Sequence, residues 1–120
     1  MGCLNPDHII IAYDIADGDE NFDIQVPVEQ DYYYDFGIQV VWADVTNAGA
    51  FDGELTIQHS IDGINFADYG LNETIDSANG NAIFMVDEIL AQTIRVEFVA
   101  NQLTGGTLDI YLMRKRRYAL

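Results

Sequence analysis

The sequence predicts an all-β fold: an antiparallel, jelly-roll-like β-sandwich of about eight strands. Apolar side chains alternate by two in most segments, whereas a helical period of 3.6 is nearly absent. Gly, Asn and Asp residues that favour turns separate these segments at intervals of about 8–14 residues. The length of 120 residues fits one domain. We expect this domain to span residues 1–113 and a short basic C-terminal tail to span residues 114–120.

The alternating segments define the expected strands and their inward faces. Successive side chains of a strand point to opposite sides, so an alternating run has one buried and one wetter face. The residues expected to face inward are Phe22, Ile24, Val26 and Val28; Leu55, Ile57, His59 and Ile61; Ile94, Val96 and Phe98; and Leu108, Ile110 and Leu112.

Two segments, residues 8–15 and 38–45, are apolar on both parities. This pattern is typical of strands covered on both faces, so we expect central strands or strands that a partner covers. Helix is scarce, and residues 86–92 are the segment in which we expect about one turn. The expected turns between strands are Asp17-Gly18-Asp19, Asn47-Ala48-Gly49, Asp52-Gly53, Asp62-Gly63, Asn79-Gly80-Asn81 and Gly105-Gly106.

The charge of the chain is strongly acidic and unevenly distributed. Twenty Asp and Glu residues oppose five Lys and Arg residues, which gives a formal net charge of -15, and four of the basic residues are Arg114, Lys115, Arg116 and Arg117. An acidic body repels nucleic acid, so we expect no general nucleic-acid binding. We expect the basic tail to meet an acidic surface on another copy or a neighbouring protein. Nucleic acid or a membrane surface is the alternative.

The sequence lacks the patterns of an enzyme or a cofactor site. His8 and His59 are the only histidines, and Cys3 is the only cysteine and has no basic neighbour to activate its thiol. No ligand spacing fits zinc, and no Gly-rich loop with a lysine could hold a phosphate. We therefore expect no enzymatic activity and no cofactor. No segment reaches the roughly 18 apolar residues of a membrane-spanning helix.

One acidic segment is a candidate cation site. Asp14, Asp17, Asp19 and Asp23 lie close together in the sequence around Gly18. Calcium takes several oxygen ligands, and flexible acidic turns supply them. The order of the carboxylates does not match an EF-hand loop. The segment is therefore a candidate calcium site or, alternatively, a solvated turn between two strands.

Residues 32–36 form an aromatic cluster between two expected strands and are a candidate interface. Alternation buries only about half of such a cluster, and exposed tyrosine is favoured at protein interfaces. The alternative is a tyrosine-rich strand edge that packs under a loop. The predicted interface combines this cluster with the basic tail. It comprises Tyr32, Tyr33, Tyr34, Phe36, Arg114, Lys115, Arg116 and Arg117.

The segment from Gly53 to Phe66 carries the most specific pattern. An alternating strand runs into Asp62-Gly63, a strong hairpin signal, and we expect Phe66 to fold back onto the core. Further along the chain come Asn79-Gly80, a strand that ends in Phe84, Ile94-Arg95-Val96-Glu97-Phe98 and Gly106-Thr107-Leu108.

In this order the motifs resemble small β-sandwich structural proteins of tailed and related phages, such as head-decoration, head-fibre or minor virion proteins. They are also similar to discoidin-like (coagulation factor 5/8 type C) jelly rolls. The resemblance covers about residues 38–113. Discoidin-like domains usually have longer ligand-binding loops than this chain, which favours the virion proteins.

The resemblance implies a non-enzymatic virion protein that decorates or joins capsid subunits. Because the sequence has no cysteine pair and no signal-peptide pattern, we expect it to be assembled in the host cytoplasm. Its expected partners are other copies of itself and capsid or other virion proteins. The alternative is a carbohydrate- or cell-surface-binding module, such as a receptor-binding fibre tip. In that module, residues 32–36, Trp42 or the acidic segment would form the ligand site.

Overall fold

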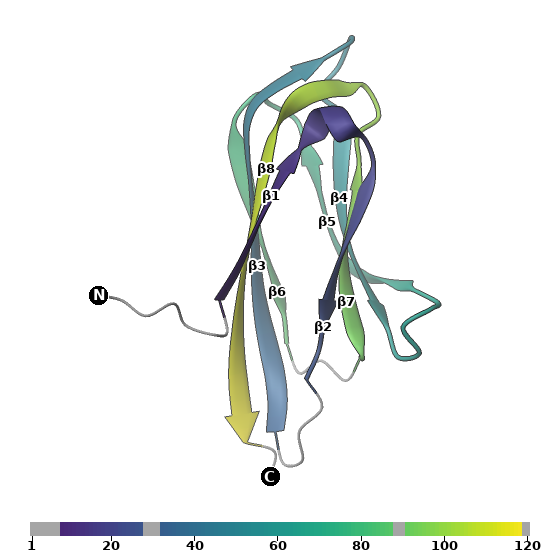
Figure 1. The fold of residues 1–120 in the computed structure, drawn as a ribbon, viewed down its shortest axis with the longest axis vertical. Helices are drawn as coiled ribbons and strands as arrows, with labels where there is room; N and C mark the ends of the chain where they lie inside the picture. The colour runs from purple at the N-terminus through teal and green to yellow at the C-terminus, as the bar shows by residue number, and fades with distance from the viewer. Residues whose placement is uncertain (1–7, 28–31, 88–90, 119–120) are drawn as a thin grey trace, which may run out of the picture.

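In the part of the chain that the structure describes, eight strands form a sandwich of two four-stranded antiparallel sheets, which confirms the predicted fold class (Figure 1). The computed structural model describes residues 8–27, 32–87 and 91–118. The elements are β1 (His8–Asp14), the 3₁₀ turn η1 (Ile15–Asp17), β2 (Glu20–Gln25), β3 (Tyr32–Asn47), β4 (Gly53–Ser60), β5 (Ala67–Ile75), β6 (Gly80–Val86), β7 (Thr93–Val99) and β8 (Leu103–Tyr118).

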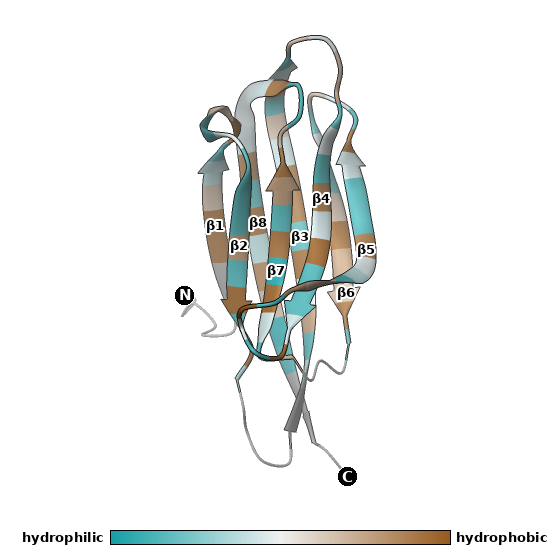
Figure 2. Cartoon of the chain, turned by 90° about the vertical axis from the view of Figure 1, so that its right-hand side faces the viewer, coloured by the Kyte–Doolittle hydropathy of each residue, from teal (hydrophilic) through white to brown (hydrophobic). Residues whose placement is uncertain are grey.

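The strand order is that of a jelly roll. Sheet A has the order β1-β8-β3-β6, and sheet B has the order β2-β7-β4-β5, whose strands stand in front in Figure 2. The first strand pairs with the last, β2 with β7, β3 with β6 and β4 with β5. The chain is therefore one long hairpin whose two arms are rolled into two layers, the arrangement of an eight-stranded jelly roll.

The inner faces of the two sheets share one hydrophobic core. The predicted inward parity is confirmed in β2, β7 and β8 and in the first part of β4. Each large apolar side chain buried in this way contributes about 1.5–3 kcal/mol. The core members that the alternation predicted are Phe22, Ile24, Val26, Leu55, Ile57, Ile94, Val96, Phe98, Leu108, Ile110 and Leu112. Val28 lies outside the described residues.

The two segments that are apolar on both parities occupy different places in sheet A. Residues 38–45 belong to β3, which lies between β8 and β6 and is central, as predicted. Strand β1 is instead an edge strand, because its one neighbour in the sheet is β8. Its residue Ile10 points away from the core and is 55% exposed.

Strand β4 ends at Ser60, before the predicted residue Ile61. Ser60 is buried, whereas Ile61 is exposed, so the expected inward position of Ile61 is wrong. The pairing of β4 with β5 shifts register between Thr56 and Gln58. His59 is only partly buried, and its ring meets that of Tyr69 edge-on with centroids 5.4 Å apart.

Phe66 does not return to the core, in contrast to the prediction from the hairpin pattern. Its ring lies against the guanidinium of Arg95, whose Cζ is 3.6 Å from the ring centroid. A cation over an aromatic face is a favourable contact, worth about 0.5–1 kcal/mol at an exposed site. This contact holds Phe66 on the outer side of sheet B.

Helical structure in the described ranges is confined to the short turn η1. The expected helical turn at 86–92 lies partly outside the described residues, since 88–90 are not among them. Val86 is the last residue of β6. Among the residues that the structure describes, no helix has the length and apolar character needed to cross a bilayer.

A β-bulge bends the central ladder of sheet A between β3 and β8. The register shifts between Ala43 and Thr46, and Asp44 has a φ of 55°. Gly106, close by on β8, has a φ of 113°. A Cβ on Gly106 would lie 2.7 Å from the Cα of Val45 and 2.9 Å from the carbonyl oxygen of Ala43. Both the backbone conformation and the close approach require glycine here.

We expect Gly106→Ala to lower the free energy of unfolding by about 2–4 kcal/mol, because it adds a steric clash to an unfavourable φ. Gly70→Ala is the matched control, since Gly70 has a φ of 100° but no atom within 4 Å of the added Cβ. The control should lose about 1–2 kcal/mol. Urea denaturation of both variants measures the difference, and equal losses would contradict the close approach at the bulge.

Candidate interaction surfaces

The outer face of sheet B is polar and contains a row of side chains that pair with one another. Asp23, Arg95, Gln58 and Asp68 form one row across β2, β7, β4 and β5. Arg95 donates to both carboxylate oxygens of Asp23, with Nε–Oδ1 at 2.7 Å and Nη2–Oδ2 at 3.1 Å. Gln58 donates to Asp68 at 3.1 Å. The hydrogen bond to Asp23 raises the pKa of Arg95, so its positive charge is fixed in this row.

The outer face of sheet A differs, because it has two apolar rows between a row that contains Asp109 and Asn81 and the pair of Asp35 and Lys115. Gly37 on β3 lies opposite Met85 on β6 and Met113 on β8. In the next row Gln39 lies opposite Ile83 and Tyr111, and Tyr111 lies opposite Ile10 of β1. The isoleucines and methionines of these rows are 55% to 62% exposed. We call this surface the sheet A face; it comprises Ile10, Gly37, Gln39, Ile83, Met85, Tyr111 and Met113.

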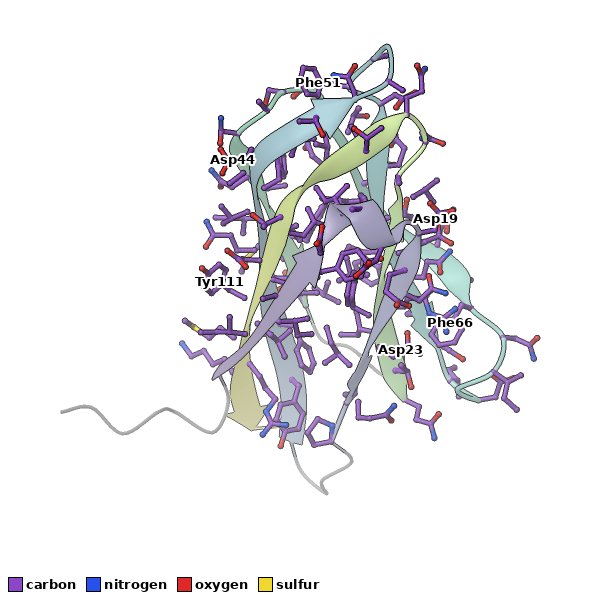
Figure 3. The ribbon with its side chains drawn as sticks, turned by 45° about the horizontal axis from the view of Figure 1, so that its top comes forward. Asp19, Asp23, Asp44, Phe51, Phe66 and Tyr111 are labelled. Atoms are coloured by element: carbon purple, nitrogen blue, oxygen red, sulfur yellow. The ribbon has the colours of Figure 1, made fainter. Side chains whose placement is uncertain are left out.

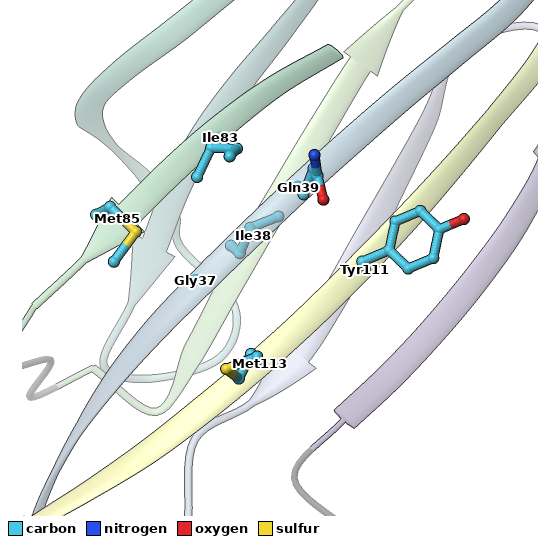
Figure 4. A pocket seen from close by; sticks show the side chains of 7 residues that line it. All are labelled: Gly37, Ile38, Gln39, Ile83, Met85, Tyr111 and Met113. Atoms are coloured by element: carbon cyan, nitrogen blue, oxygen red, sulfur yellow. The ribbon is translucent and has the colours of Figure 1, made fainter. Parts of the chain in front are cut away.

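A shallow groove of about 230 Å³ runs across the sheet A face (Figure 4). Gly37 leaves room for the groove because it has no side chain, and the side chains of Met85 and Met113 flank it. Gln39 lines the groove as well and is held by Asn81 at 3.4 Å. A glycine inside a strand often marks a place where another molecule or backbone approaches closely.

Two further exposed apolar side chains lie on the loop between β4 and β5. Ile61 is 79% exposed and Ile64 is 80% exposed. We call residues 61–65 the isoleucine loop. In Figure 1 the β4–β5 connection projects to the right, on the side of the sandwich away from sheet A. Solvent exposure of two isoleucines so close together is unfavourable unless a partner covers them.

The isoleucine loop is ordered by the carboxylate of Asp62. Its Oδ1 accepts hydrogen bonds from Ser60 Oγ at 2.9 Å and from the backbone N–H groups of Ile64 and Asn65 at 2.8 Å each. Its Oδ2 accepts from the Asn65 side chain at 2.8 Å. The base of the loop is tied down too, because Gln92 N donates to the Ser60 carbonyl at 2.8 Å. The two isoleucines are therefore presented on a pre-ordered turn.

The same hydrogen bonds favour the charged form of Asp62. The N–H of Asn65, followed by that of Ile64 and by the side chains of Asn65 and Ser60, holds the pKa of Asp62 well below its usual value of 3.8. A lowered pKa in the folded state means that the stabilisation is fully present above the unfolded pKa. It is lost as the pH falls from there through the folded pKa.

We therefore expect Asp62→Asn to lower the free energy of unfolding at about pH 7. The difference in this free energy between the variant and the wild type should shrink below about pH 4. Urea midpoints of both proteins across this range measure the effect. Asp68→Asn is the control, because Asp68 accepts a single side-chain hydrogen bond from Gln58. A wild-type advantage that grows on acidification would contradict the role assigned to the Asp62 carboxylate.

The structure places the predicted aromatic and basic residues on neighbouring strands. Strand β8 continues through Tyr118, and residues 32–36 pair with residues 114–118, so the basic residues lie in the sheet rather than after it. Tyr34 and Phe36 are only 4% and 0% exposed, because both point into the core. They therefore do not line a surface. The side chains of Tyr32, Tyr33, Arg116 and Arg117 lie outside the described part of the structure.

Of the basic residues at positions 114–117, Arg114 and Lys115 have described side chains, and these two differ in their environment. Arg114 is half-buried, and its guanidinium lies 5.3 Å from the ring centroid of Tyr34, so it packs within its own chain. Lys115 is exposed and lies opposite Asp35 at the end of sheet A nearest to Met113. Of the predicted interface, Lys115 is the described side chain most open to a partner.

The four candidate calcium ligands are not brought together. Asp14 accepts from the N–H of Ala16 at 3.0 Å, Asp19 accepts from the N–H of Ala100 at 2.8 Å, and Asp23 is held by Arg95. Figure 3 shows Asp19 and Asp23 at separate positions along the sheet B side. Across residues 8–27, 32–87 and 91–118, no group of three or more His, Cys, Asp or Glu side chains is placed to hold a metal ion. Asp14 caps the turn η1, which contains Asp17, whereas Asp23 lies on β2.

We expect the addition of EDTA to leave the melting temperature unchanged, because two of these carboxylates already cap backbone N–H groups and a third is paired with arginine. Differential scanning calorimetry with and without excess calcium measures this. A calcium-dependent rise in melting temperature that Asp19→Asn abolishes would contradict the expectation and support the cation site.

Trp42 is not placed to bind a ligand. It is 4% exposed and points into the core. Gly80 of β6 packs on its ring, so closely that an added Cβ would lie 2.7 Å from the indole. A sugar-binding platform needs an accessible aromatic face, which Trp42 does not offer.

The fold and its surfaces thus define a jelly-roll β-sandwich with a polar outer face on sheet B and an apolar patch on the outer face of sheet A. No protein-family model matches the chain, and no curated protein matches it. Among solved structures, the chain is similar to the Yersinia pseudotuberculosis-derived mitogen, with a TM-score of 0.55 and 13% identity over 91% of this chain and 86% of that one. This likeness supports the β-sandwich fold.

A second solved structure, from Bacillus endospore appendages, which form a family of disulfide-linked pili, aligns with 100% of this chain and 97% of that one. The TM-score is 0.35 and the identity is 10%.

Proposed function

We propose that this protein is a non-enzymatic structural protein that assembles with other copies of itself and with partner proteins through the sheet A face. The contrast between the two outer faces carries the proposal. Sheet B presents polar side chains on its outer surface, including the paired row of Asp23, Arg95, Gln58 and Asp68, whereas sheet A presents aligned isoleucine and methionine side chains. Soluble monomers rarely expose a large contiguous apolar patch, and such patches mark interaction sites.

The chemistry of the groove supports contact rather than catalysis. Its described side chains are aliphatic, thioether and amide groups, apart from the phenol of Tyr111. Among the described groups, those with a shifted pKa are Tyr13, Asp62 and Arg95, which lie outside the groove and take part in turns or an ion pair. Perturbed titratable groups are common at catalytic sites, and here they are separate from the cavity.

More specifically, we propose that the protein is part of a virion, as a capsid decoration protein or a minor capsid or fibre component. The motifs within residues 38–113 support this, as does the jelly-roll architecture, which recurs in viral capsid domains. Assembly would take place in the host cytoplasm. Jelly rolls also occur in lectins, but the burial of Trp42 and Tyr34 removes two of the aromatic faces that a glycan would stack on.

We expect the double variant Ile83→Ser, Met113→Ser to weaken self-association roughly a hundredfold or more, because each substitution removes about 1.5–3 kcal/mol of apolar burial. Its melting temperature should stay close to that of the wild type, since both side chains are exposed in the single chain. Light scattering over a concentration series measures the assembly. Val99→Ser, on the outer side of β7, is the control and should assemble as the wild type does.

The dependence of assembly on ionic strength distinguishes an apolar contact through the sheet A face from an ionic contact through the basic residues of β8. Chains with a net charge of -15 repel one another, and salt screens that repulsion, so an apolar contact should strengthen as ionic strength rises. An assembly that dissociates in salt and survives the Ile83→Ser, Met113→Ser change would contradict the sheet A face as the main contact.

A further inference from the structure

We infer that the groove of the sheet A face receives the isoleucine loop of a second copy, so that copies join head to tail. The inference rests on the proposed function, because it names the segment that occupies the face. Among the described residues, six large apolar side chains are more than half exposed. Four of them lie on the sheet A face and the other two on the isoleucine loop, so each of these apolar surfaces has a candidate partner on another copy.

The two surfaces lie on different sides of the molecule. The groove crosses the outer side of β3, between β6 and β8 (Figure 4). The loop joins β4 to β5, and β5 is the edge strand of the other sheet. A single chain therefore does not fill its own groove with its own loop, whereas two copies can make this contact without a change of fold.

The groove has the size and chemistry for aliphatic side chains. Its volume is about 230 Å³, and Ile83, Met85 and Met113 line it. A cavity of about 150 Å³ lined by aliphatic groups is enough to hold a benzene molecule, so this groove has room for a branched aliphatic side chain. Methionine side chains adapt their shape to what they contact, which suits them to an inserted isoleucine.

The loop is already ordered before it binds. The Asp62 carboxylate accepts four hydrogen bonds, and Gly63 N donates to Ser60 Oγ at 2.9 Å. Pre-ordering removes part of the entropy cost of association. Ile61 and Ile64 are therefore presented to a partner at little further cost in ordering the backbone.

Charge favours this pairing over other contacts between two acidic chains. Lys115 follows Met113 by two residues on the same outward side of β8, and its side chain is exposed at that end of the groove, opposite Asp35. The isoleucine loop brings Asp62 between its two isoleucines. The carboxylate of Asp62 can thus approach Lys115 of a neighbouring copy, and opposite charges placed in this way help to fix the orientation of a contact.

A contact between two different surfaces leaves one groove and one loop unused in every pair. Each unused surface can take another copy, so the contact generates open chains unless the rotation between copies closes a ring. A face-to-face dimer would instead use the same surface twice and stop at two chains. The assembly size therefore reports the geometry of the contact.

The test uses two variants of the whole chain. The loop variant carries Ile61→Ser and Ile64→Ser. The groove variant carries Gly37→Val, which fills the groove from the middle of β3. Gly37→Ala is the milder version, since its Cβ would meet only the sulfur of Met85, at 3.8 Å, an ordinary contact. Ile61→Val with Ile64→Val keeps the loop apolar and is the matched control. Melting temperatures establish that each variant folds.

Each of the loop and groove variants should be monomeric by light scattering where the wild type is polymeric, and the valine control should polymerise. An equimolar mixture of the two variants should form a species of two chains and nothing larger. The intact groove of the loop variant then receives the intact loop of the groove variant. The Gly37→Ala protein should fold at least as well as the wild type and assemble more weakly.

Two results overturn the inference in different ways. If the wild type assembles, the groove variant does not, and the loop variant assembles like the wild type, another surface occupies the groove; the proposed function then stands and the loop assignment fails. If the wild type stays monomeric at every concentration tested and with its partner proteins, the proposed function fails and the inference with it.

Discussion

The structure depends on the antiparallel ladder between β3 and β8. This ladder joins residues that are far apart in the sequence, and it fixes which side chain of each strand faces the core. It places Gly37 beside Met113, residues 32–36 beside the basic residues, and the bulge at Asp44 beside Gly106. A shift of one residue would turn Phe36 and Ile38 outward and the sheet A face inward. The bulge and the close approach of Gly106 make such a shift costly, because only one register accommodates both.

The core lies between the inner faces of the two sheets, and the two outer faces carry different kinds of side chain. On sheet B, two acids, one amide and one arginine form a row of paired side chains, so the outer surface is polar. On sheet A, long apolar side chains surround a glycine, and no described group on the same chain covers them. An exposed Ile or Met alone is ordinary, but aligned rows on neighbouring strands form a surface. The difference between the faces, rather than any single residue, points to assembly.

The sequence was sufficient for the parts of the fold that depend on local alternation. Phe22 and Ile24 on β2 and Ile110 on β8 follow the inward parity, because a strand with one apolar face has a single way to bury it. Long-range pairing was not visible in the same way. The edge position of β1 and the strand character of residues 114–118 depend on partners at the other end of the chain. Ile61 and Phe66 were misplaced because Asp62 ends β4 early and Arg95 offers Phe66 a contact outside the core.

The unlike faces have a consequence for any object that this protein covers. A chain that docks through sheet A turns its polar sheet toward the solvent and brings a net charge of -15 with it. A layer of such chains converts an apolar or neutral surface into a densely anionic one. Objects coated in this way repel one another over about a Debye length, which keeps them dispersed as a colloid. Coverage by this protein would thus give a large assembly the solubility that its own surface lacks.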